Sequence, residues 1–388
     1  MAKGAFYKGR RKKRNFAIVP AVIVLFLLAV IIVLFYSTQK YAVITDEGVR
    51  VELPILTGKG GSSASGEDSY GGIVEYEQVS ADISFIAADY STVEANAGNG
   101  VKGARAIYIP YENLNHEFII ACADRLKTGN ALMLQLKKND GYIAYYSDAP
   151  IAYSYGLNMA AVDSKTDLQS IVDELKSRDI YLIAEISVLI DDLFASHAPS
   201  VSLLNQWNTV LYDINGVYID PFNSITREYT VQLVRELWDM GFDEVVLANV
   251  FMPTVSRDES DESSDPLINY NEQMSTTPTS TIAISSFCVN ICQQLEDRDS
   301  GKFVSVYIDT PYALVRADSD TGQDGRPFMK IFDRCFYRTD RYAYSYNCSD
   351  IEPYVSIGTV KNRLVPVVVE YLPDNTSWVL IDSEEDNS

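Results

Sequence analysis

The chain contains few of the residues that many enzyme mechanisms require. Its 388 residues include two histidines, His116 and His197, and five cysteines, and no Cys-x-x-Cys pair occurs. No His, Cys and Asp spacing suggests a zinc site, so we expect neither a metal nor another cofactor. The sequence also lacks a Gly-x-Ser-x-Gly elbow and a phosphate-binding glycine loop. These absences argue against an α/β-hydrolase triad and against nucleotide chemistry.

Basic residues are scarce beyond the first 15 positions. Residues 1–15 carry seven Lys and Arg and no acid, which leaves 25 basic against 53 acidic residues and a net charge of −28 for the rest. So acidic a body repels phosphate backbones, and we expect no nucleic-acid partner.

The basic segment 1–15 precedes an apolar run, FAIVPAVIVLFLLAVIIVLFY, at residues 16–36. This run is uncharged and long enough to cross a bilayer as a helix. The positive-inside rule places residues 1–15 in the cytoplasm and the bulk of the chain outside it. A cleaved signal peptide is the alternative, but its apolar region would be shorter, and no small-x-small cleavage site is evident. We predict a single-pass cell-membrane protein.

The region after the apolar run divides by composition. Residues 37–57 predict a short β-hairpin that turns at Asp46-Glu47-Gly48. Residues 58–73 form a Gly/Ser-rich linker, and residues 74–103 an irregular lead-in. We expect one large domain over residues 104–388.

Short apolar runs alternate with helical patterns throughout this domain. Helices are predicted at 115–128, 166–179, 226–240 and 285–296. Strands are predicted at 105–111, 131–138, 180–190, 244–251, 303–309, 342–347, 364–372 and 378–382. This order favours an α/β protein with a (β/α)8 TIM-like barrel. An open doubly wound sheet is the alternative, and it would need a Gly-rich turn after its first strand.

Two acidic segments, residues 257–265 and 317–325, follow predicted strands. In a barrel they would lie at the C-terminal mouth, where such folds place their sites. Charge runs are usually solvated, so we interpret both as solvated loops.

The longest recognisable motif is GVYIDPFNSITREYTVQLVRELWDMGFDEVVLANVFMP, at residues 216–253. With ARAIYIPY at 104–111 and ALMLQLKKNDGYIAYYSDAP at 131–150, it resembles a bacterial family described as a putative glycosyl hydrolase domain. The resemblance covers residues 104–382. It implies a barrel of the glycoside-hydrolase type that acts on polysaccharide.

Several charged positions depart from the pattern of that family. The family carries Asp where this chain has Gln135 and Ala248, Arg where it has Glu185 and Phe251, and Asp near Tyr307. The packing positions persist. Such a pattern indicates a retained fold whose original chemistry was lost or moved to other residues.

Glycoside hydrolysis generally needs two carboxyls, one to protonate the leaving oxygen and one to attack or to activate water. Four acids are candidates: Glu185, Asp220, Asp309 and Glu370. Glu185 lies in an apolar strand, where burial would raise its pKa, although it could instead be a paired structural acid. Asp220 could face the cleft or cap the next helix. Asp309 and Glu370 end strands, where barrel sites lie.

Tyrosine is abundant, with 26 residues against three tryptophans. Aromatic rings that carry a hydroxyl suit sugar rings, and they suit a barrel rim equally well. We predict sugar contacts from Tyr108, Tyr142 and Tyr346. Asp192 could bind sugar hydroxyls or cap a turn.

Three functions remain open from the sequence. The first is a membrane-anchored barrel outside the cytoplasm that binds or hydrolyses cell-wall or surface polysaccharide. The second is an inactive barrel that serves as a glycan-binding or protein-docking module. The third is a structural partner of other envelope proteins, with no glycan ligand. Fold analogy alone does not decide among them.

Overall fold

The computed structural model describes residues 42–45, 48–51, 88–93, 98, 100–126, 130–158, 168–205, 207–254, 268–269, 278–340, 360–370, 372 and 376–381. The chain separates into two compact units, residues 1–79 and 80–388. In the first unit, β1 (Ala42–Thr45) pairs antiparallel with β2 (Gly48–Val51). The apolar run at 16–36 and the linker at 58–73 lie outside the described residues. No helix in the described part of the chain is long and apolar enough to cross a membrane.

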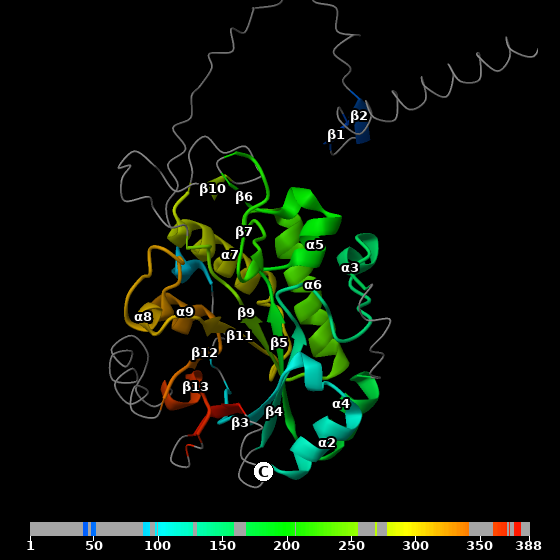
Figure 1. The fold of residues 1–388 in the computed structure, drawn as a ribbon, viewed down its shortest axis with the longest axis vertical. Coiled ribbons are helices and arrows are strands. Elements are labelled where there is room, and N and C mark those ends of the chain that lie inside the picture. The colour runs from blue at the N-terminus through cyan, green and yellow to red at the C-terminus, as the bar shows by residue number, and fades with distance from the viewer. Residues whose placement is uncertain are drawn as a thin grey trace, which may run out of the picture. The chain divides into compact units, whose positions relative to one another are not determined.

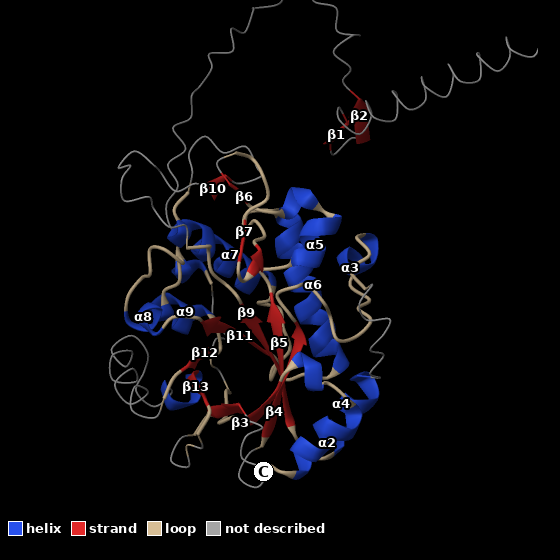
Figure 2. Cartoon of the chain, in the orientation of Figure 1, coloured by secondary structure: helices blue, strands red, loops and turns tan. Residues whose placement is uncertain are grey.

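The second unit contains a closed barrel of eight parallel strands (Figures 1 and 2). Around the barrel the order is β11-β12-β13-β14-β3-β4-β5-β9. The strands are β3 (Arg105–Ile109), β4 (Ala131–Lys137), β5 (Tyr181–Ser187), β9 (Glu244–Ala248), β11 (Phe303–Ile308), β12 (Cys335–Arg338), β13 (Leu364–Val368) and β14 (Trp378–Ile381). The predicted (β/α)8 architecture is therefore confirmed.

One strand of the barrel was not predicted. β12 is the four-residue segment Cys-Phe-Tyr-Arg, which pairs with β11 on one side and β13 on the other. The predicted strand at 342–347 lies outside the described residues, and the barrel closes without it. β12 is too short for an alternation pattern, and charged residues stand at both of its ends. Only its pairing with two neighbours identifies it as a strand.

Helices cover the outside of the strands (Figure 2). The α-helices are α2 (His116–Asp124), α3 (Pro150–Ser154), α4 (Leu168–Ser177), α5 (Asp192–His197), α6 (Ser224–Met240), α7 (Ser280–Gln294), α8 (Pro311–Val315), α9 (Gly325–Ile331) and α11 (Val360–Arg363). Single 3-10 turns are η1 (Tyr90–Thr92), η2 (Tyr111–Asn113) and η3 (Pro199–Val201). Two-residue strands are β6 (Leu204–Asn205), β7 (Tyr212–Asp213), β8 (Gly216–Val217) and β10 (Ile268–Asn269).

Local sequence sets the helix boundaries. The Asn223 side chain accepts a hydrogen bond from the Ile225 N–H at the start of α6. Gly241 ends that helix with φ of 119°, a left-handed conformation that glycine adopts without strain. α7 begins five residues before its predicted start, because Thr279 caps it by accepting from the Ile282 N–H.

The barrel interior follows the two-residue period of its strands. An apolar layer comprises Ala106, Met133, Ile183, Val246, Phe336, Val365 and Val379. Towards the N-terminal ends of the strands lies a buried ionic cluster. There Glu244 pairs with Arg334, and it accepts hydrogen bonds from Tyr181 Oη at 3.0 Å and Ser305 Oγ at 2.5 Å. The cluster and the apolar layer close the barrel below its mouth.

Candidate functional site

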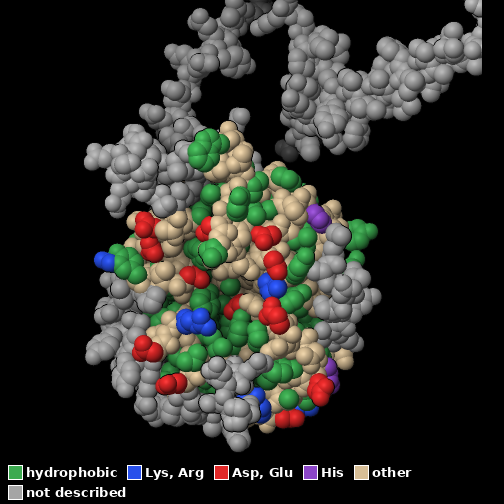
Figure 3. All heavy atoms as spheres, viewed as in Figure 1, with side chains coloured by type: hydrophobic (Ala, Val, Ile, Leu, Met, Phe, Trp, Pro, Cys, Tyr) green, Lys and Arg blue, Asp and Glu red, His purple; other side chains and the backbone are tan. Residues whose placement is uncertain are grey.

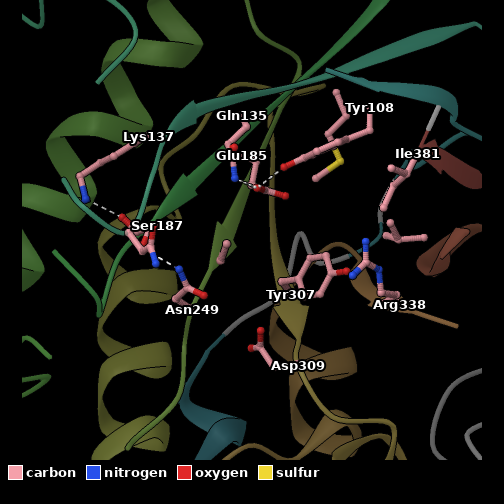
Figure 4. Close-up of a pocket in the computed structure, with 14 residues that line it drawn as sticks. Tyr108, Gln135, Lys137, Glu185, Ser187, Asn249, Tyr307, Asp309, Arg338 and Ile381 are labelled. Carbon is pink, nitrogen blue, oxygen red and sulfur yellow. Dashed lines mark hydrogen bonds between the residues drawn. The ribbon is translucent and has the colours of Figure 1, made fainter. Parts of the chain in front are cut away.

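A pocket of about 310 Å³ opens at the C-terminal ends of the barrel strands. Its lining residues, drawn in Figure 4, are Tyr108, Met133, Gln135, Lys137, Asn139, Glu185, Ser187, Ala248, Asn249, Tyr307, Asp309, Arg338, Val367 and Ile381. Many of them stand two residues beyond a member of the apolar layer, so the strand period aims them into the mouth. The face in Figure 3 is hollowed near its centre, with acidic and basic side chains around the hollow. Barrel enzymes place their sites at this end.

Glu185 is the most deeply buried acid in the pocket, with 6% of its surface exposed. It lies on β5, two residues beyond Ile183. Its Oε1 accepts hydrogen bonds from Tyr108 Oη at 2.9 Å and from Gln135 Nε2 at 3.0 Å. Burial raises the pKa of Glu185, and the two hydrogen bonds act against that rise. The carboxyl is therefore held in one orientation by β3 and β4.

Asp309 follows β11 and is held by Gln323. The Asp309 N–H donates to Gln323 Oε1 at 3.0 Å, and Gln323 Nε2 donates back to Asp309 Oδ2 at 2.9 Å. The side chain of Asp309 is open to solvent in the pocket, yet the surrounding walls displace much of the water near its carboxyl. This loss of hydration raises its pKa to about 7, and the charge of Glu185 adds to the rise. Near neutral pH, Asp309 is present in both protonation states.

A fixed polar group forms another part of the wall. Lys137 Nζ donates to Ser187 O at 2.7 Å and pairs with Asp191 Oδ2 at 2.7 Å, and both charged side chains are 2% exposed. Asn249 Nδ2 donates to Ser187 Oγ at 2.8 Å. Asn249 adopts φ of 55°, a left-handed conformation that Asn tolerates better than most residues. Because Asp191 neutralises the Lys137 charge, we interpret Lys137 as a structural residue of the pocket wall.

The pocket brings together three of the predicted site residues, Glu185, Asp309 and Tyr108. Tyr346 lies outside the described residues. Four others do not line the pocket: Asp220, Glu370, Tyr142 and Asp192.

Those four residues have other surroundings. Asp220 is fully buried and accepts from the Phe222 N–H at 2.8 Å, in the turn that leads into α6. Asp192 accepts from the Val217 N–H at 2.6 Å, in the first turn of α5. Glu370 is exposed beyond β13, and Tyr142 is 42% exposed in the loop after β4.

The positions that depart from the resembled family pattern gather at this pocket. Gln135, Glu185, Ala248 and Tyr307 all line it. Phe251 instead packs edge-on against Tyr218, with ring centroids 6.2 Å apart. Four of the five positions therefore belong to the pocket surface and not to the packed barrel beneath it.

Several polar residues of the site were not predicted, among them Lys137, Asn249 and Arg338 of the pocket lining and Gln323, which contacts Asp309. A signal for Lys137 was present, because Gln135 and Lys137 are alternate polar residues in an otherwise apolar strand. Arg338 would have followed from recognising β12. Gln323 lies in a loop that reads as solvated, yet it is fully buried. No local pattern identifies it.

Comparison with known proteins gives a family match and several distant matches to solved structures. A hypothetical protein from Ruminiclostridium thermocellum is 17% identical, with 52% of this chain and 96% of that chain covered and a TM-score of 0.40. Trehalose-6-phosphate hydrolase of Bacillus licheniformis is 11% identical, with 69% and 57% covered and a TM-score of 0.42. Ega3 of Aspergillus fumigatus, in complex with galactosamine, is 10% identical, with 71% and 80% covered and a TM-score of 0.36.

The match to trehalose-6-phosphate hydrolase spans 57% of that enzyme's length. A comparison with curated proteins gave no match. The model of a family described as "Putative glycosyl hydrolase domain" matches residues 106–335, which is more than half of the chain. On this match, and with the parallel barrel that the family resemblance implied, the chain belongs to the putative glycosyl hydrolase domain family.

Proposed function

We propose that the pocket binds a glycan and that Asp309 and Glu185 together hydrolyse a glycosidic bond in it. One observation carries the proposal: two carboxyls from different strands line one pocket at the mouth of the barrel. Their charges interact, because the Glu185 charge raises the pKa of Asp309. Glycoside hydrolysis generally uses two carboxyls that flank the scissile bond, and this pocket supplies two.

The surroundings suggest a role for each acid. Asp309, with a pKa of about 7, can carry a proton at neutral pH and deliver it to the leaving oxygen. Burial raises the pKa of Glu185, and the hydrogen bonds from Tyr108 and Gln135 act against that rise by favouring the ionised form. Glu185 would attack the sugar or activate water. The Tyr108 and Tyr307 rings supply aromatic surface for the sugar.

A second function is favoured by Ala248. This residue lines the pocket where the resembled family carries an acid, and its side chain cannot ionise. If Asp309 and Glu185 do not replace that acid, the pocket binds a glycan without cleaving it. The same barrel could then dock to other envelope proteins.

We also propose the setting in which the barrel acts. The basic segment 1–15 and the apolar run 16–36 would anchor the chain in the cell membrane, with the barrel outside the cytoplasm. The linker at residues 58–73 would let the barrel extend away from the membrane. Cell-wall or surface polysaccharide would then be the available substrate.

The experiment uses the full-length chain, purified in detergent, with a panel of bacterial wall and surface polysaccharides. Binding and new reducing ends are both measured. Asp309→Asn and Glu185→Gln are compared with Glu370→Gln, a matched change at an exposed acid outside the pocket. We expect release to fall about 100-fold or more in the two pocket variants only. Release that survives both variants would refute the assignment, and binding without any product would favour the glycan reader.

A further inference from the structure

Arg338 presents a positive charge at the mouth of the pocket from a barrel strand. It ends β12, two residues beyond Phe336 of the apolar layer, and it pairs in register with Val367. The strand period therefore turns Arg338 towards the barrel axis, and it lines the pocket. A strand holds such a group more firmly than a loop does.

Arg338 forms no ion pair with an acid in the part of the chain that the structure describes. Among the described residues, its guanidinium also takes part in no side-chain hydrogen bond. The contrast with Lys137 is direct, because Lys137 is buried against Asp191 at 2.7 Å. Lys137 is thus part of the wall, whereas Arg338 remains exposed and available to a ligand.

Tyr307 lies beside Arg338 (Figure 4). Burial raises the pKa of Tyr307 well above its usual value, and the Arg338 charge only partly offsets that rise. The phenol therefore keeps its proton and can donate a hydrogen bond. A guanidinium next to a phenolic O–H offers several donors to one anionic group, and the planar guanidinium fits a carboxylate or a sulfate with two parallel bonds.

We propose that Arg338 and Tyr307 recognise an anionic group on the sugar, so that the ligand of this pocket is an acidic glycan. The inference rests on the proposed glycan-binding function and names its substrate class. A uronic acid carboxylate and a sugar sulfate share the chemistry that this pair of donors selects.

The net charge of the chain, −21, opposes an anionic polymer at long range. At physiological salt that repulsion is screened beyond about 8 Å. The local contact with Arg338 then favours an acidic sugar over a neutral one at this position.

The test measures affinities of the full-length chain in detergent for uronic-acid trisaccharides of several ring types, for their neutral methyl esters and for sulfated trisaccharides. The acid and its ester share one ring and differ in charge. Arg338→Gln removes the charge, and Arg338→Lys keeps it without the two-pronged geometry. Arg316→Gln is the matched control, because Arg316 is an exposed arginine that stacks on Tyr312 and does not line the pocket.

We expect the acids to bind more tightly than their esters, and Arg338→Gln to weaken acid binding by about tenfold to a hundredfold without changing ester binding. Arg338→Lys should fall between, and Arg316→Gln should change nothing. Tighter binding of the sulfated sugars than of the acids would assign the site to sulfate. Equal binding of acids and esters, or equal weakening of both by Arg338→Gln, would overturn the inference.

Turnover separates this inference from the proposed function. Cleavage of neutral glycans that depends on Asp309 but not on Arg338 would leave the proposed function standing and remove the inference. Acid binding that depends on Arg338, with no cleavage, would do the reverse. Binding of no glycan at all would refute both.

Discussion

Replacing Gln323 with methionine should raise the pKa of Asp309 above about 7. Gln323 Nε2 donates to Asp309 Oδ2 at 2.9 Å, and this bond lowers the pKa by favouring the ionised carboxylate. A hydrogen bond to a charged group is worth about 1.5–3 kcal/mol, or about one to two pH units. Solvent in the open pocket weakens the effect, so we expect a rise of about half a unit to one unit.

The same change should destabilise the fold. Gln323 also donates to Val250 O at 3.0 Å and Tyr307 O at 3.2 Å, and it accepts from the Asp309 N–H. Methionine has nearly the same shape but offers none of these bonds. Buried groups that lose their partners cost about 1–3 kcal/mol each, and pocket water replaces some of the bonds. We expect a total loss of about 2–4 kcal/mol.

The pKa is measured by 13C NMR titration of the aspartate carboxyl carbons, with the Asp309 signal assigned by its loss in Asp309→Asn. Urea unfolding measures the stability. Gln294→Met is the control, because Gln294 is exposed on α7 and its side-chain amide donates to Asn290 of the same helix. A folded Gln323→Met protein whose Asp309 pKa stays the same or falls would refute the account of this carboxyl.

Further predictions concern the barrel around the site. Glu244→Gln should cost about 3–5 kcal/mol in urea unfolding, because Arg334 would stay buried without its carboxylate; a cost below about 1 kcal/mol would contradict this. Raised pKa values of Asp309 and Glu185 mean that the folded state binds their protons more tightly. Stability from these groups is therefore full below about pH 4 and, for Asp309, is lost as pH rises to about 7. The melting temperature of Asp309→Asn should therefore rise relative to that of the wild type between about pH 4 and pH 7. A difference in melting temperature that stays constant over this range would contradict the raised pKa of Asp309. Asn249→Ala should be less stable than Asn249→Gly by about 1 kcal/mol, because φ is 55° there; equal unfolding midpoints would mean that the backbone relaxes.

The barrel could be predicted because most of its strands are recognisable in the sequence as apolar runs. β4 and β5 are long apolar runs buried on both faces, which is typical of parallel strands. β12 was missed because its four residues end in Arg338 and follow Arg334, whereas β14, which is equally short, is wholly apolar and was predicted. β12 is recognised as a strand by its hydrogen bonds to β11 and β13, and the local sequence does not indicate such pairing.

The site was predictable where a single strand decides the outcome. Glu185 interrupts an apolar strand, and Asp309 ends one, so both could be placed at the mouth. Asp220 also follows a strand-like run, yet its carboxylate bonds to the backbone two residues on, at Phe222. Local sequence cannot separate that turn from a cleft residue. Gln323 contacts Asp309 because of the way its loop folds, and no sequence pattern predicts that fold.

Asp309 and Glu185 are proposed to act together on a bound glycan. The most direct test is the rate of reducing-end release by the full-length chain as a function of pH, beside Asp309→Asn. We predict a rate that falls as pH rises through about 7, because Asp309 loses the proton that it delivers. The variant should lose both the activity and this limb of the profile. Absence of release at every pH, or a limb near pH 7 that persists in Asp309→Asn, would contradict the claim.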